Sequence, residues 1–238
     1  SPQIEAEQMK RVFWHLGDKE PDYRSLMKHQ QDFVLEGKSI PVARLVICEQ
    51  THSNLIHHCR EEDCGAGLNN HPQIAVADGF VSNIDNQYLV IRTADCFPVL
   101  FFDEQKMVVA AVHSGREGTR QNIAGKAVKA MVEHYSCDPK NIVAHVGAGI
   151  CEEHYEVSEA LWNQFNDSLS RNELCPCTQH YRHLNLRTTI FQQLLKAGLR
   201  FINIENHHEC TYENPAYFSY RRDKGNNRQI NLIGISNE

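Results

Sequence analysis

Two apolar runs separated by a short polar segment constrain the fold of this chain more than any other feature. The runs are Phe97–Phe102 and Met107–Val112, and the segment between them is Asp103–Lys106. Apolar runs of this length with polar boundaries are typical of buried strands, and a four-residue connection is typical of a β-hairpin. A loop of these four residues pairs Phe102 with Met107. The sequence therefore predicts a buried antiparallel hairpin.

The same pairing places Cys96 opposite His113, just beyond the apolar runs. Directly opposed residues point to the same face of the ladder, with Cβ atoms roughly 4.5–5.5 Å apart. A thiol and an imidazole at this distance can share a zinc ion, for which His52 is a candidate third ligand. They can also act as a nucleophile and its base, or Cys96 can be a buried core residue. The spacing alone leaves these alternatives open.

The rest of the hydrophobic pattern predicts strands mixed with helices. This mixture indicates an α/β (α+β) fold, a single domain over residues 1–238 with a mixed sheet and flanking helices. The expected strands are Val42–Glu49, Ile74–Val81, Tyr88–Thr93, Asn141–Val146, Phe201–Ile204 and Ile230–Ile235. The expected helices run from Thr119 or Asn122 to Tyr135, from Ser158 to Ser170 and from Arg187 to Ala197.

Composition excludes some classes of protein. The formal charge of −6 lacks the basic excess that binding to a nucleic-acid polymer requires. No apolar run approaches the roughly 18 residues of a membrane span, and no signal-peptide pattern is visible. Nine scattered cysteines, an odd number, fit a reducing compartment better than a disulfide framework. We therefore expect a cytoplasmic protein.

The C-terminal part holds a second cluster of residues that suit a ligand. Tyr212 and Phe218 lie close in sequence to Arg221 and Arg222. Aromatic rings can stack on a planar base, and guanidinium groups can hold a phosphate through two hydrogen bonds each. The glycines of Gly147–Gly149 could in addition present backbone N–H groups to an anion.

Several of these segments together resemble one known family. They are Gln50-Thr51-His52, Thr93-Ala94-Asp95-Cys96, Val112-His113-Ser114-Gly115, residues 147–157, and Cys210-Thr211-Tyr212 with Phe218-Ser219-Tyr220-Arg221-Arg222. In these motifs the chain is similar to the YfiH-type proteins, the bacterial laccase-domain or polyphenol-oxidoreductase family. Members of that family are described as purine nucleoside phosphorylases.

The resemblance implies a zinc site formed by His52, Cys96 and His113 in a mixed α/β sandwich. It also implies a cytoplasmic enzyme that cleaves adenosine, inosine, guanosine or methylthioadenosine with phosphate. Adenosine deamination and the editing of peptidoglycan precursors are further activities linked to the family. Small-molecule nucleoside and phosphate are the implied partners, and the oligomeric state stays open.

The chain departs from the family pattern at three places, one of which is the absence of the common proline from Gly147–Cys151. The usual His-Ala-Gly-Trp-Arg-Gly run reads His113-Ser-Gly-Arg116-Glu-Gly118 here, so that the tryptophan is absent and the arginine is shifted. The usual N-terminal motifs are not recognisable in residues 1–40, which we treat as a divergent part of the domain.

On this interpretation the motif residues take roles in nucleoside chemistry. Arg221, Arg222 and Arg116 are expected to hold phosphate, with Tyr212 or Phe218 stacked on the purine. Asp95, next to the proposed catalytic pair Cys96 and His113, is expected to support the site or carry a proton.

Three other functions compete with this one. Copper is possible at a Cys-His-His site, but multicopper oxidases use repeated His-x-His pairs, and the sequence contains none. A metal-free Cys-His hydrolase or deamidase would use Cys96 as its nucleophile. A non-catalytic protein that binds nucleosides or cell-wall precursors is the third competing function.

Overall fold

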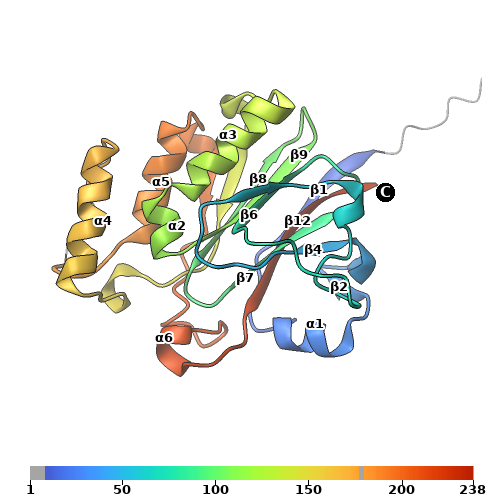
Figure 1. The fold of residues 1–238 in the computed structure, drawn as a ribbon, viewed down its shortest axis with the longest axis horizontal. Helices are drawn as coiled ribbons and strands as arrows, with labels where there is room; N and C mark the ends of the chain where they lie inside the picture. Colours follow the sequence, from blue (N-terminus) through green and yellow to red (C-terminus); the bar gives the residue numbers. More distant parts are fainter. Residues whose placement is uncertain (1–8, 177–179, 238) are drawn as a thin grey trace, which may run out of the picture.

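The predicted hairpin forms the centre of the larger sheet in the computed structural model, which describes residues 9–176 and 180–237 (Figure 1). Its strands are β8 (Phe97–Asp103) and β9 (Val108–Ser114), and nearly every residue in them is buried. The prediction of a buried antiparallel hairpin is confirmed. The order of this six-stranded sheet is β11 (Ile204–Asn206), β10 (Val143–Val146), β8, β9, β6 (Gly79–Ser82) and β5 (Ile56–His58).

The register of the hairpin differs from the predicted one by two residues. His113 pairs with Pro98, and not with Cys96 as the sequence had suggested. Because side chains alternate along a strand with a period of two, a shift of two residues leaves Cys96 and His113 on the same face. The correction therefore moves the two side chains along the ladder without separating them onto opposite faces.

The turn of the hairpin explains the shift. Strand β8 continues through Asp103, which pairs with Val108, so that Asp103 is not a loop residue. The carboxylate of Asp103 accepts the backbone N–H groups of Gln105 and Lys106 and thereby closes the turn. Met107 has a φ of 51° and belongs to the turn and not to the ladder.

A second sheet packs on the first. Its order is β1 (Lys10–His15), β12 (Gln229–Asn237), β7 (Tyr88–Thr93) and β4 (Leu45–Ile47). Because side chains alternate between the two faces of β8, the hairpin packs against other elements on both faces. Val99 and Phe101 pack with the helices, whereas Leu100 packs with Leu89 and Ile233 of the second sheet. The buried hairpin thus requires cover on both faces.

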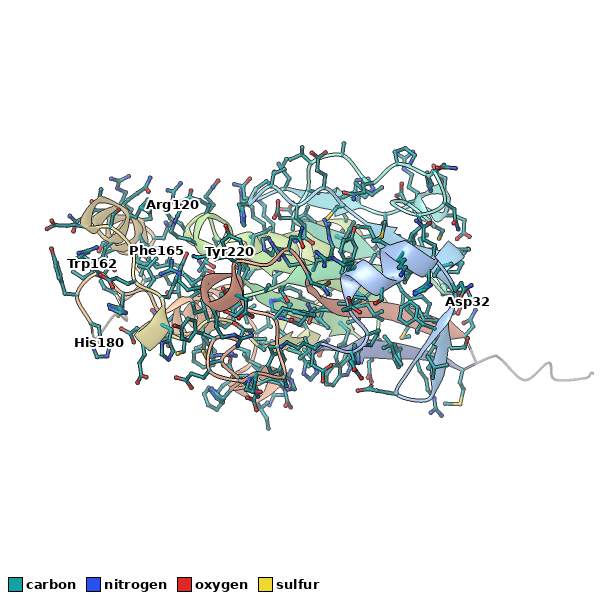
Figure 2. All side chains as sticks on the ribbon, turned by 90° about the horizontal axis from the view of Figure 1, so that it is seen from below. Asp32, Arg120, Trp162, Phe165, His180 and Tyr220 are labelled. Carbon is teal, nitrogen blue, oxygen red and sulfur yellow. The ribbon has the colours of Figure 1, made fainter. Side chains whose placement is uncertain are left out.

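Helices cover the outer face of the six-stranded sheet. They lie together on one side of the molecule in Figure 1, and Figure 2 labels Phe165, a buried residue of α4, and the more exposed Trp162. Asn122 and Ser158 cap two of these helices through their side chains, as the sequence predicts. These helices are α2 (Arg116–Arg120), α3 (Ile123–Tyr135), α4 (Glu159–Arg171) and α5 (Leu186–Lys196).

A smaller layer covers the second sheet on its other face. It contains α1 (Tyr23–His29), β2 (Phe33–Leu35) and β3 (Lys38–Ile40), which pack on residues such as Val90 and Leu232. The molecule is a mixed-sheet α/β sandwich, which confirms the predicted fold class. Within the described residues, no helix combines the length and apolar character that crossing a membrane requires.

Some predicted elements needed correction. Strand β4 is shorter than Val42–Glu49 because residues 42–44 form a 3-10 turn, and the strand predicted at Ile74–Val81 begins only at Gly79. The strand predicted at Phe201–Ile204 is also wrong in its bounds, because residues 201–203 form a 3-10 turn and β11 begins only at Ile204. The first 40 residues, for which no element was predicted, include β1 paired along its full length with β12.

Candidate metal centre

Three side chains with ligand atoms converge at the open end of the hairpin. The ligand atoms of His52, Cys96 and His113 all lie within 4.8 Å of one another. Cys96 immediately precedes β8, His113 is close to the end of β9, and His52 lies in the loop that follows β4. The ring centroids of the two histidines are 5.1 Å apart. The structure therefore brings together the three residues proposed as metal ligands from the sequence.

Asp78, which no sequence argument identified, organises this cluster. Its carboxylate is fully buried and accepts a hydrogen bond from Nδ1 of His113 at 2.7 Å. It also accepts the backbone N–H groups of Thr51, His52 and Ser53 at 2.8–3.1 Å. One carboxylate thus fixes both the His113 ring and the loop that carries His52. The bond to Nδ1 leaves Nε2 of His113 as the atom free to bind a metal.

Gly115 leaves the space that the sulfur occupies. A Cβ atom on Gly115 would lie 2.7 Å from Sγ of Cys96 and 3.4 Å from Nδ1 of His52. Contacts this short exclude any side chain unless the sulfur moves. The glycine is therefore a steric requirement of the cluster.

Charge and burial have opposite effects on the ionisation of the cluster. Burial opposes the thiolate form of Cys96, but the attraction and hydrogen bond of His113 outweigh burial and lower the pKa of Cys96 to about 6. Burial likewise opposes the charged form of His113, while Cys96 and Asp78 raise its pKa. Without a metal the two groups form a thiolate–imidazolium pair. Despite its burial, Asp78 has its pKa lowered to about 2 by its hydrogen bonds with His113 and Ser53.

The donor set fits a zinc ion. One thiolate sulfur and two imidazole nitrogens are typical zinc ligands, and three protein ligands leave a fourth position for a substrate or water. The hydrogen bond between Asp78 and His113 matches the usual carboxylate support of a metal-binding histidine. The same donors also accept copper, so the set does not by itself decide the metal.

A cavity of about 850 Å³ opens over the three residues and is lined by all of them. Its remaining wall is rich in cations and tyrosines, in contrast to the net negative charge of the chain. Among the described residues these cations form no ion pair with a carboxylate. The cavity thus suits an anionic ligand. The cations and tyrosines are Arg92, Arg221, Lys224, Arg228, Tyr155 and Tyr220 (Figure 2 labels Tyr220).

Asp95 lines the same cavity, with both carboxylate oxygens engaged. Oδ1 accepts the hydroxyl of Thr211 at 2.7 Å, and Oδ2 accepts the backbone N–H of Arg221 at 2.7 Å. Its backbone carbonyl accepts the N–H of Ile150, and its φ is 117°. These contacts show Asp95 holding three segments of the wall in place immediately before Cys96.

The other residues proposed to bind substrate are distributed differently. Arg221 lines the cavity, and Arg116 contacts the hydroxyl of Tyr155, which also lines it. Arg222 is outside the lining, where its guanidinium donates to the backbone carbonyls of Thr211, Tyr212 and Tyr217. Its contacts indicate a structural role in the C-terminal loop.

The two aromatic residues proposed to stack on the purine also lie outside the cavity lining. Tyr212 stacks on His154 with ring centroids 4.3 Å apart, and Phe218 lies beneath the Lys19 ammonium group. The tyrosines that line the cavity are Tyr155 and Tyr220.

A comparison with protein families identifies the group to which the chain belongs. The family described as "Multi-copper polyphenol oxidoreductase laccase" matches residues 12–236. The chain belongs to this laccase-domain family. One curated relative is "Purine nucleoside phosphorylase" from Corynebacterium glutamicum, 28% identical over 225 residues, which cover 94% of this chain and 88% of the relative. Another is purine nucleoside phosphorylase YlmD from Bacillus subtilis, 26% identical over 93% of this chain and 80% of that protein.

Solved structures of the laccase-domain family share the fold. The crystal structure of the Bacillus licheniformis protein YfiH gives a TM-score of 0.74 at 27% identity, covering 81% of this chain and 74% of YfiH. YlmD from Geobacillus stearothermophilus also gives 0.74, at 29% identity and with coverage of 82% and 74%. These matches confirm the family and the fold predicted from the motifs.

Proposed function

We propose that this chain is a zinc-dependent purine nucleoside phosphorylase that uses the cavity above His52, Cys96 and His113. Several relatives in the family carry the name purine nucleoside phosphorylase. The observation that supports the proposal most strongly is the meeting of a Cys-His-His cluster with a cationic wall in one cavity. A nucleoside and a phosphate ion together need an apolar or aromatic surface, fixed positive charge and a means of stabilising the departing base.

The reaction exchanges one bond for another at the sugar. A phosphate oxygen attacks C1′ of the ribose, the C1′–N9 bond breaks, and the bonding electron pair leaves with the base, which takes up a proton. The products are a purine base and ribose 1-phosphate. A bound zinc ion would supply Lewis acidity close to the reacting groups.

The cations of the wall bind and orient phosphate in this scheme. Arg221 lies over the ring of Tyr155, and Lys224 lies over the ring of Tyr220, which holds both charges at the cavity surface. Because these cations form no ion pair with a carboxylate among the described residues, their charged groups can form charge-assisted hydrogen bonds with an incoming phosphate. The aromatic surface available to the purine is the part of the Tyr155 and Tyr220 rings that these cations leave uncovered.

The same centre supports adenosine deamination as a second activity. Three protein ligands with an open position are the arrangement by which zinc enzymes activate water, and replacement of the adenine amino group consumes one water and releases ammonia. Phosphorolysis and deamination act at different atoms of the nucleoside, so their products can be measured independently.

The proposal is tested by incubating the zinc-loaded protein with adenosine, inosine, guanosine and methylthioadenosine, with and without phosphate. We expect base and the matching sugar 1-phosphate in equal amounts only when phosphate is present: ribose 1-phosphate from adenosine, inosine and guanosine, and 5-methylthioribose 1-phosphate from methylthioadenosine. Release of ammonia from adenosine would show that the protein also catalyses deamination. Base release without phosphate would indicate a hydrolase, and activity that persists after chelation but is lost in Cys96→Ala would indicate the metal-free nucleophile. Oxidation of a polyphenol only after copper loading would favour the oxidoreductase.

A further inference from the structure

A second group of ligand-type side chains lies beside the cavity wall, outside the centre described above. The segment after β10 meets the segment after β11 through a parallel bridge between Gly149 and Cys210. Two backbone hydrogen bonds, from Gly149 to Glu209 and from Thr211 to Gly149, fasten the two segments together. Each segment carries two side chains with metal-binding atoms at a spacing of three residues. These are Cys151 and His154 on the first segment, and Cys210 and Glu213 on the second.

We propose that Cys151, His154 and Glu213 form a second zinc-binding site, with the thiol of Cys210 adjacent to it. The ligand atoms of these three residues lie within 4.8 Å of one another. Nε2 of His154 is 3.0 Å from Oε1 of Glu213, and Sγ of Cys151 is 3.6 Å from the same oxygen. Zinc bonds of about 2.0–2.3 Å in tetrahedral geometry give ligand separations of roughly 3.3–3.8 Å. The three atoms therefore need only small movements to surround one ion.

The local structure holds His154 in position. His154 ends a 3-10 turn that begins at Glu152, so that its backbone N–H binds the carbonyl of Cys151 at 3.2 Å. Its ring stacks on Tyr212 at an interplanar angle of 19°. These contacts keep the imidazole facing the second segment.

Cys210 brings a second sulfur to the same place. Its Sγ accepts the backbone N–H of Cys151 at 3.3 Å. Thiolate sulfur, imidazole nitrogen and carboxylate oxygen together are ligands of zinc, whereas magnesium and calcium take oxygen ligands alone. The chemical class of the donors therefore indicates zinc and not a hard cation.

The site is open to solution on one side. A cavity of about 460 Å³ is lined by Cys151, Cys210 and Glu213, which gives a metal ion a path of entry. This cavity shares only Ile150 with the lining of the cavity over His52, Cys96 and His113. The side chains of His154 and Glu213 are 32% and 53% exposed, so an ion can reach them without unfolding of the chain.

Its position suggests what the ion would do. Ile150 donates its N–H to the carbonyl of Asp95 at 2.8 Å, and Thr211 donates its hydroxyl to the Asp95 carboxylate. The two segments that the second ion would join are therefore the segments that fix Asp95, the residue before Cys96. We assign the second zinc a bracing role for this wall of the cavity.

The test is a count of bound zinc by elemental analysis after the chain has been stripped of metal, reloaded with zinc and freed of excess. We expect two zinc ions per wild-type chain and one in Cys96→Ser. One is also expected in Cys151→Ser and in His154→Ala. His180→Ala is the matched control, since this histidine lines the same cavity outside the ligand set, and it should retain two.

A cobalt measurement keeps the test independent of enzyme activity and of the first centre. In Cys96→Ser loaded with cobalt, we expect thiolate-to-cobalt charge-transfer absorption, which the added change Cys151→Ser abolishes. One zinc per wild-type chain that disappears in Cys96→Ser and is unchanged in Cys151→Ser overturns the proposal. Absence of the charge-transfer absorption from cobalt-loaded Cys96→Ser also overturns it. Neither result bears on the proposed phosphorolysis.

Discussion

Asp78 is the residue on which the arrangement of the candidate metal centre depends most. It binds the His113 ring and the backbone at His52, so that two of three proposed ligands share one buried support. In Asp78→Asn the amide keeps the volume but loses the charge and one acceptor oxygen. We expect zinc affinity to fall about 10–100-fold, as measured by competition with a coloured chelator. Asp63→Asn, which alters a comparable pair with His57 elsewhere, should leave the affinity unchanged.

Equal zinc affinity in Asp78→Asn and wild type would show that the hydrogen bond to His113 does not support the metal. Measurement of thermal unfolding in the zinc-free variant separates loss of the ligand geometry from loss of the fold.

Ionisation of Cys96 gives a second prediction at this scale. Because its pKa is about 6, the metal-free thiol should be mostly thiolate at pH 7 and should lose reactivity as the pH falls through 6. The rate of alkylation of the Cys96 peptide, followed by mass spectrometry, should be half-maximal near pH 6. In His113→Ala the midpoint should rise toward the ordinary value of about 8.5. Cys48, whose burial raises its pKa to about 12, serves as the unreactive internal control.

An alkylation midpoint near 8.5 in the wild type would contradict the thiolate–imidazolium pair. It would also weaken the case for a metal-free nucleophile as the competing mechanism.

At the scale of elements, the hairpin and the loop after it must approach each other closely. The change Gly115→Ala places a Cβ atom 2.7 Å from the Cys96 sulfur, so the sulfur or the loop has to move. We expect zinc affinity to fall at least tenfold, as judged by chelator competition. Gly225→Ala is the control, because a Cβ atom there meets nothing within 4 Å. If Gly115→Ala binds zinc as tightly as wild type, the loop is not a steric limit on the site.

The hairpin also shows how far the sequence alone can predict this fold. The apolar runs identify both strands, but pairing depends on the turn, and the side chain of Asp103 fixes a register that composition cannot reveal. The two-residue error kept Cys96 and His113 on one face, which is why the site prediction survived it. Strand β1 escaped prediction because its pairing partner, β12, lies more than 200 residues away.

The candidate site was predictable only in part, for a similar reason. His52, Cys96 and His113 each lie near a strand end, where the sequence pattern is strong. Asp78 offered one signal, an acidic residue within a predicted apolar strand, since a buried carboxylate needs hydrogen-bond partners. Arg92 and Arg228 reach the cavity from β7 and from the segment before β12, and only the tertiary fold brings them together.

At the scale of the whole molecule, a chain of net charge −6 presents a cavity whose wall is positive. Such a contrast favours a small anion over a nucleic-acid polymer. In Lys224→Ala we expect the KM for phosphate to rise about tenfold, which corresponds to loss of one charged hydrogen bond, while the KM for the nucleoside changes little. Lys129→Ala, on the exposed face of α3, is the control. A rise confined to the nucleoside KM would place the phosphate elsewhere.

The central claim is that phosphate-dependent cleavage of nucleosides requires the metal centre at His52, Cys96 and His113. The most direct measurement is ribose 1-phosphate formation from inosine by metal-stripped and zinc-reloaded protein. The account predicts no product from the stripped chain, recovery of activity on reloading in the wild type, and no recovery in Cys96→Ala. Equal product formation by the stripped and reloaded wild-type chains would contradict it.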